Sequence, residues 1–179
     1  LDTQEGRRHK TAPHLARQLM AALIHWFPER QFVFLGDGGY ASHELARFCH
    51  RHQRHATLVS RFYAHARLYA PAPKRRGHVG RPRTKGRRLP TPEPVVARKV
   101  KIRTTVSWYG GGNRRIQYVS GTGHWYKGSS GLVPVRWVFV HDCQGTHRDD
   151  IFYSTDISLS APQIISWFTA RWPLETTFK

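Results

Sequence analysis

The feature that most limits the fold is a strand, a glycine-rich turn, a helix and a second strand in close succession. Residues 31–35 form a short, nearly all-apolar run, which is typical of a central parallel strand buried on both faces. Residues 36–40 supply the turn, Ser42 is expected to cap the helix, and residues 56–60 form the next strand. This order predicts a parallel strand pair with a right-handed crossover, and therefore an α/β fold.

Two further helices are predicted, one near the beginning of the chain and one near its end. The first opens at Thr11 and Pro13 and ends near Pro28, with apolar residues at helical spacing between them. The last opens at Ser160, with Gln163 placed to complete a capping box. Steps of four, three and four put four of its residues on one face: Ile164, Phe168, Arg171 and Glu175. Pro173 is expected to kink this helix just before Glu175.

Residues 63–156 read as a β-rich insert between a core part at 1–62 and a final core helix at 157–179. Strand-like stretches lie at 100–108, 115–120, 133–141 and 150–155, and a glycine-rich turn at 110–113 separates the first two. Residues 71–94 are rich in proline and glycine and are expected to form a mobile loop. That loop carries the cations Lys74, Arg75, Arg76, Arg81, Arg83, Lys85, Arg87 and Arg88, for which DNA phosphates are the expected partner.

Charge indicates the class of partner. The 179 residues include 29 Lys and Arg against 11 Asp and Glu, a formal net charge of +18, which favours a polyanion such as nucleic acid. A non-catalytic basic nucleic-acid-binding protein would share this balance. Two cysteines are too few for a disulfide framework and suit a reducing cytosol, and no apolar run reaches the ~18 residues of a membrane span. We therefore expect no membrane partner and a cytoplasmic location.

Two carboxylates are the candidate catalytic residues. Asp37 directly follows the predicted strand, at the edge where open α/β sheets bind ligands. Glu175 lies four residues after Arg171 among aromatic residues. Together they could hold Mg²⁺, or Mn²⁺, for phosphoryl transfer, with a third carboxylate expected. The alternatives are that Asp37 only caps a turn and that Glu175 only pairs with Arg171 on the surface.

Other titratable residues allow further readings. Cys49, His50, His52 and His55 are possible zinc ligands, but no second cluster would close a tetrahedral site, so we reject zinc. Asp142, Asp149 and Asp150 could be loop carboxylates near the site, although turns suit them equally.

The residues at 168–175 resemble a known signature. Phe168-x2-Arg171-x3-Glu175 is similar to the Y-x2-R-x3-E-x6-K signature of bacterial insertion-sequence transposases of the DDE type, and residues 35–40 resemble their second-aspartate motif. The resemblance implies an RNase H-like core, incomplete at the N-terminus, with a β-rich insert before the final helix. It also implies that Asp37 and Glu175 are the second and third metal ligands. Arg171 would contact DNA or steady Glu175, and Phe168 and Tyr40 would support the site. A bacterial, nucleoid-associated location is a further implication of the resemblance.

The chain departs from the signature in three ways. Phe replaces the usual Tyr at 168, the signature lysine would fall beyond Lys179, and Asp2 stands too close to the first helix to be the first aspartate. We therefore expect that aspartate upstream of Leu1 and expect the 179-residue chain to be inactive alone. The intact protein would cut and rejoin transposon ends and target DNA, with a homodimer possible in a synaptic complex. An inactive transposon remnant is the remaining alternative.

Overall fold

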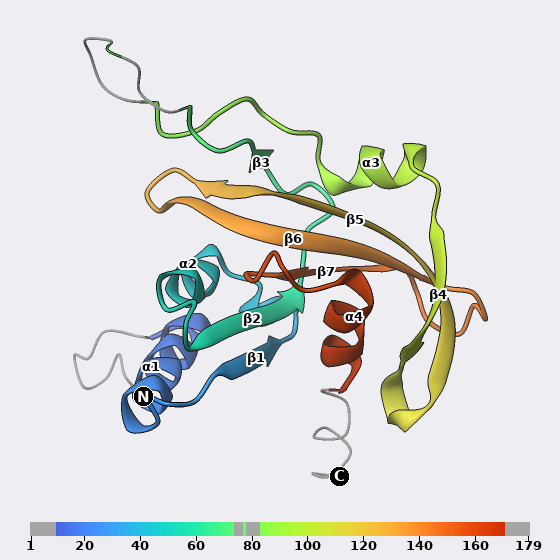
Figure 1. The fold of residues 1–179 in the computed structure, drawn as a ribbon, viewed down its shortest axis with the longest axis horizontal. Coiled ribbons are helices and arrows are strands. Elements are labelled where there is room, and N and C mark those ends of the chain that lie inside the picture. The colour runs from blue at the N-terminus through green and yellow to red at the C-terminus, as the bar shows by residue number, and fades with distance from the viewer. Residues whose placement is uncertain (1–9, 74–76, 78–82, 171–179) are drawn as a thin grey trace.

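The computed structural model describes residues 10–73, 77 and 83–170 (Figure 1). Within these residues a mixed sheet has the order β1-β2-β7-β6-β5-β3, and β4 also pairs with β5. The strands are β1 (Phe32–Gly36), β2 (Ala56–Arg61), β3 (Leu68–Tyr69), β4 (Ile102–Ser107), β5 (Asn113–Lys127), β6 (Gly131–Asp142) and β7 (Asp150–Ser154). The helices are α1 (Ala12–Trp26), α2 (His43–Arg51), α3 (Pro92–Arg98) and α4 (Ala161–Ala170), with short 3-10 turns η1 (Gly38–Tyr40) and η2 (Tyr109–Gly111).

The predicted parallel pair is confirmed. β1 and β2 pair in parallel and are connected through α2. Ser42 caps α2, because its Oγ accepts the backbone N–H of Leu45 at 3.2 Å, and such a cap stabilises a helix by about 1 kcal/mol. The expectation that β1 is buried on both faces is wrong, since Val33 is 41% exposed. Among the described residues β1 pairs only with β2, so it lies at an edge of the sheet.

The strands in the region predicted to be an insert form an antiparallel part of the sheet that is continuous with the parallel pair. β5 and β6 form a long hairpin, and β7 pairs with β6 on one side and with β2 on the other. β5 runs well beyond the predicted 115–120 because β6 pairs with it as far as Lys127. Gly121 lies inside this strand, where a Cβ would come within 2.8 Å of the Trp137 ring. The glycine therefore makes room for the indole and is no strand ending.

Part of the predicted loop at 71–94 is ordered. Residues 86–89 run back along β3, with the N–H of Ala70 bonded to the carbonyl of Arg87 at 2.9 Å. The N–H of Leu89 likewise donates to the carbonyl of Leu68 at 2.8 Å. α3 then begins at Pro92, because proline is tolerated in the first turn of a helix. The prediction of a mobile loop over residues 71–94 was therefore wrong for the end of this segment, which pairs with β3 and begins α3.

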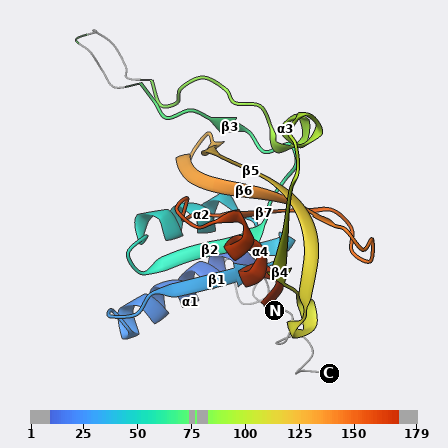
Figure 2. The same cartoon turned by 45° about the vertical axis from the view of Figure 1, so that its right-hand side comes forward.

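Helices cover both faces of the sheet, in two separate apolar clusters (Figure 2). α1, α2 and α3 contribute to a cluster on one face, which includes Leu45, Leu58 and Tyr153. α4 contributes to the cluster on the other face, where Ile164 and Phe168 are buried. No helix within the described ranges is both long and apolar enough to cross a membrane.

Candidate active site

Asp37 stands at the carboxyl end of β1, as predicted. It follows Gly36, and its Oδ1 accepts the backbone N–H of Gly39 at 2.9 Å, which caps η1. Its backbone carbonyl accepts a hydrogen bond from the buried Ser60 Oγ on β2 at 2.9 Å. Asp37 is exposed and has no ion pair with another described residue. Asp37 therefore caps the turn, and its carboxylate also remains open to solvent.

The turn after β1 is packed closely enough to require glycine. A Cβ at Gly36 would lie 2.8 Å from the Cβ of Tyr40 and 3.4 Å from the Ser60 Oγ. Tyr40, predicted to support the site, therefore lies directly over the end of β1, with 38% of its surface exposed. The backbone that carries Asp37 is held by Tyr40 on one side and by Ser60 on the other.

α4 lies beside this edge of the sheet. It contacts both β1 and β2, and Figures 1 and 2 show it next to the arrowheads of these strands. Ser160 Oγ accepts the N–H of Gln163 at 3.3 Å, as predicted for the cap. Phe168 is fully buried, and its ring stacks on Phe152 with centroids 4.1 Å apart. The predicted helix face is thus the core-facing side at Ile164 and Phe168.

Two of the candidate residues cannot be placed against Asp37. Arg171 and Glu175 lie outside the described residues. Within the described ranges, no three His, Cys, Asp or Glu side chains gather closely enough to hold a metal ion. The pairing of Asp37 with Glu175 therefore stays a prediction.

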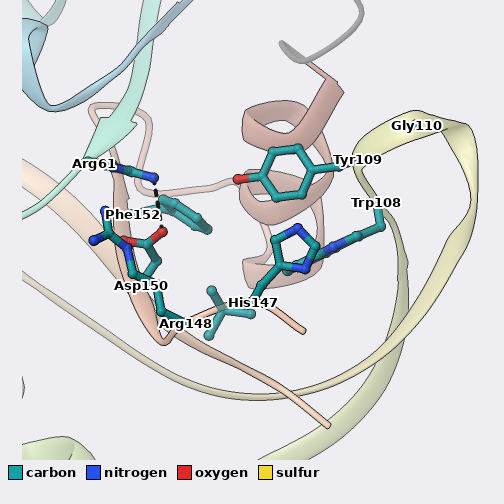
Figure 3. A pocket seen from close by; sticks show the side chains of 9 residues that line it. Arg61, Trp108, Tyr109, Gly110, His147, Arg148, Asp150 and Phe152 are labelled. Carbon is teal, nitrogen blue, oxygen red and sulfur yellow. Dashed lines mark hydrogen bonds and ion pairs between the residues drawn. The ribbon is translucent and has the colours of Figure 1, made fainter. Parts of the chain in front are cut away.

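A cavity of about 330 Å³ opens on the α4 face of the sheet (Figure 3). Its lining combines aromatic rings with charged groups: Arg61, Trp108, Tyr109, Gly110, Val140, His147, Arg148, Asp150 and Phe152. The Tyr109 and His147 rings stack with centroids 5.2 Å apart and planes 16° from parallel. Arg61 directly follows Ser60, whose Oγ bonds to the Asp37 carbonyl. The cavity and the turn that carries Asp37 are therefore joined to the same end of β2.

Two of the residues that line this cavity, Arg61 and Asp150, form an ion pair. Arg61 Nη2 on β2 lies 3.2 Å from Asp150 Oδ2 on β7. Burial raises the pKa of Asp150 above its ordinary value, and the nearby Arg61 and Arg148 offset only part of that effect. The Arg61 guanidinium also lies 6.0 Å from the centre of the Phe168 ring, which links the pair to α4. No local sequence pattern pointed to Arg61, because its partner Asp150 lies on β7, 89 positions away along the chain.

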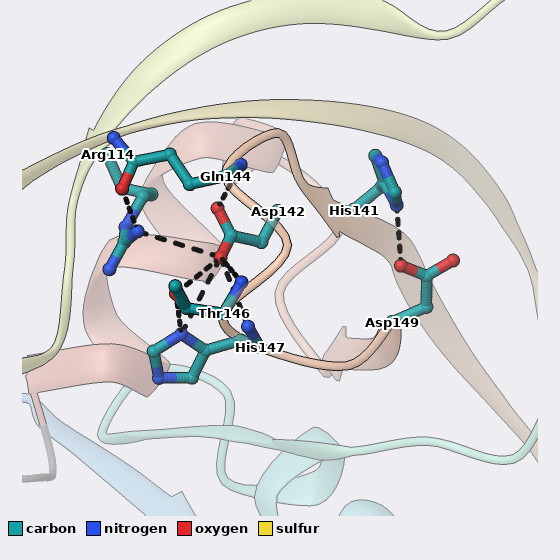
Figure 4. Close-up of polar contacts among 7 residues, drawn as sticks. All are labelled: Arg114, His141, Asp142, Gln144, Thr146, His147 and Asp149. Carbon is teal, nitrogen blue, oxygen red and sulfur yellow. Dashed lines mark hydrogen bonds and ion pairs between the residues drawn. The ribbon is translucent and has the colours of Figure 1, made fainter.

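A buried aspartate shapes the loop that carries His147 (Figure 4). Asp142 is 2% exposed and accepts backbone N–H bonds from Gln144, Thr146 and His147 at 3.0, 3.1 and 3.2 Å. Burial alone would raise its pKa, but these bonds and the Arg114 charge outweigh burial, and the pKa is lowered. Asp142 therefore organises a turn, whereas the exposed Asp149 pairs with His141 at 2.7 Å.

The rejected zinc ligands lie on or just after α2. Cys49 is fully buried in the apolar cluster, and burial raises the pKa of its thiol to about 12. The side chain is therefore protonated at neutral pH and serves as part of the core.

The predicted phosphate-binding cations divide into three groups. Lys74, Arg75, Arg76 and Arg81 lie outside the described residues. Arg83, Arg87 and Arg88 are exposed. Lys85 is half-buried, with its ammonium 4.1 Å from the Tyr126 ring centre and 4.6 Å from that of Tyr69. Lys85 therefore fastens the returning segment to β3 and β5.

Comparison with known proteins identifies the family. No curated protein matches the chain. The family model described as DDE superfamily endonuclease matches residues 2–115, a range that includes β1, Asp37 and β2. The mixed sheet with helices on both faces agrees with the RNase H-like fold of that family. Because the match covers more than half of the 179 residues, the chain belongs to the DDE superfamily endonuclease family.

Proposed function

We propose that this protein cuts and rejoins transposon DNA by phosphoryl transfer that depends on a divalent metal ion, Mg²⁺ or Mn²⁺. Membership of the family supports a nuclease that acts on DNA and uses divalent metal. The observation that carries the proposal is the exposed carboxylate of Asp37, held at the carboxyl end of a parallel strand beside α4. The excess of positive charge supports DNA as the partner.

The oxygen donors fit such an ion. Mg²⁺ prefers carboxylate oxygens and water, and Asp37 offers one oxygen that is not engaged by the Gly39 N–H. Asp37 and Glu175 would hold the ion. A divalent ion at such a site supplies Lewis-acid stabilisation of charge on phosphoryl oxygens. The chain must supply a second carboxylate, and Glu175, on the continuation of the α4 sequence, is the residue we propose.

The other residues at this edge would hold the catalytic carboxylate in place. Ser60 holds the Asp37 carbonyl, and Tyr40 closes over Gly36, so the carboxylate is carried on a fixed backbone. Preorganisation of this kind matters because small displacements of a reacting group lower rates strongly. Arg61, the residue after Ser60, places a cation in the cavity on the α4 face, where its guanidinium, paired with Asp150, would favour an approaching phosphate.

The test is single substitution of each carboxylate. We expect Asp37→Asn and Glu175→Gln each to abolish metal-dependent cleavage of transposon-end DNA, because both side chains would lose the charge that holds the ion. DNA binding should stay within a few-fold of wild type. Glu29→Gln is the matched control, since Glu29 is an exposed acid without an ion pair to any described residue.

The outcomes separate the alternatives. Wild-type cleavage by either variant would refute the assignment of that residue. Intact, full-length wild-type protein that binds DNA but never cleaves it with Mg²⁺ or Mn²⁺ would instead favour a non-catalytic DNA-binding protein.

A further inference from the structure

The face of the sheet opposite α4 carries cations near the start of β5. Side chains alternate along a strand, and Val106 and Ile116 point toward the α4 cluster. Arg103 on β4 and Arg115 on β5 therefore point the other way. Arg103 pairs with Gln117 and Thr105 pairs with Arg115, so the two arginines are diagonal neighbours on one face. The Cα atoms of such neighbours usually lie about 7–8 Å apart. We call Lys101, Arg103 and Arg115 the outer arginine patch.

A shallow depression of about 520 Å³ lies at this patch. Arg103, Thr105, Arg115, Gln117 and His141 are among its lining residues, so hydrogen-bond donors surround it. Arg103, Thr105 and Arg115 are exposed. Lys101 lies at the side, with its ammonium 5.5 Å from the centre of the Phe139 ring.

The two arginines of the patch have no ion-pair partner in the part of the chain that the structure describes. Asp149, the acid bonded to the patch's neighbour His141 at 2.7 Å, is engaged by that ring. Glu93 on α3 pairs with His65 at 3.0 Å.

Such an arrangement does not stabilise the fold. Like charges on neighbouring strands repel, and neither arginine adds to either apolar cluster. The charge pattern instead suits an external anion. Guanidinium groups bind phosphate through paired hydrogen bonds, and hydroxyl and amide side chains such as Thr105 and Gln117 commonly donate to phosphate oxygens as well.

We propose that the outer arginine patch binds the phosphate backbone of double-stranded DNA, as a contact surface additional to the Asp37 edge and the segment around Arg83–Arg88. The proposal rests on the proposed function for its choice of DNA as the polyanion. The patch and the α4-side cavity lie on opposite faces of one sheet, so DNA at the patch extends the contact beyond the edge that carries Asp37.

The test compares two double variants that remove the same charge. Arg103→Gln/Arg115→Gln removes both arginines of the patch, and Arg51→Gln/Arg54→Gln removes two exposed arginines at and just after the end of α2. Affinity for a short DNA duplex is measured over a range of salt concentrations with a chelator present, so that no cleavage occurs. We expect the slope of log affinity against log salt to fall in magnitude by about 1 per patch arginine, and to change little in the control.

Two further measurements interpret the result. Arg103→Lys/Arg115→Lys should keep most of the wild-type slope, because lysine keeps the charge. Thermal unfolding should be unchanged in all three variants, since the residues are exposed. A wild-type slope in the Gln patch variant would overturn the proposal, as would equal losses in patch and control variants. Because the assay measures binding without metal, its result is independent of whether Asp37 and Glu175 cleave DNA.

Discussion

At the scale of single residues, Asp142 connects stability to pH. Its folded-state pKa is lowered, so its contribution is fully present above the unfolded pKa and is lost as pH falls through the folded pKa. We expect Asp142→Asn to lower the free energy of unfolding at pH 7 by roughly 1–3 kcal/mol, because one of the two accepting oxygens becomes an NH2 donor and the negative charge is lost. The difference from wild type should shrink below about pH 4.

Asp149→Asn is the control from the same loop and should change stability by no more than about 1 kcal/mol. Urea unfolding at several pH values measures both, and a pH-independent difference would contradict this account.

At the scale of elements, α4 depends on the burial of one ring. Phe168 is fully buried, and its ring stacks on Phe152 and faces the Arg61 guanidinium. We expect Phe168→Ala to destabilise the protein by about 3–5 kcal/mol, because it leaves a cavity, whereas Phe168→Leu should lose clearly less. Cleavage should fall with stability in the alanine variant, since α4 leads into Glu175. Chemical denaturation gives the free energies, and equal stability of wild type and Phe168→Ala would show that the ring does not hold α4 to the sheet.

At the scale of the whole molecule, the excess charge should govern affinity for DNA. Arg83, Arg87 and Arg88 are exposed on the segment that Lys85 fastens to β3 and β5. We expect replacement of all three by Gln to weaken DNA binding for every sequence tested and to flatten its salt dependence, because each phosphate contact releases counterions. Replacement of Arg30, Arg51 and Arg54 by Gln removes equal charge elsewhere and should flatten the dependence less. A titration over several salt concentrations measures both slopes, and an unchanged slope in the first variant would exclude phosphate contact by these residues.

The limits of sequence-based prediction follow from the reach of each signal. The Ser42 cap and the strand before Asp37 depend on a few neighbouring residues, and both were predicted correctly, whereas the burial of that strand on both faces was not. The helix at Pro92 was missed because its prolines resemble loop composition, although the first turn of a helix accepts them. β5 was predicted too short because Gly121 weakens the local strand pattern, and only the Trp137 ring across the hairpin explains that glycine.

The sequence by itself determined the parallel pair, the turn that carries Asp37, the capped helix that leads toward Glu175, and the positive charge that favours DNA. Only the tertiary structure decided that β7 joins β2, which brings Arg61 against Asp150 from 89 positions away and opens the cavity beside α4. The register of β4 with β5 likewise decides that the outer arginine patch and the α4 cluster lie on opposite faces of the sheet. The physical reason is that caps and turns form within one segment, whereas strand pairing depends on which distant apolar faces can be buried together.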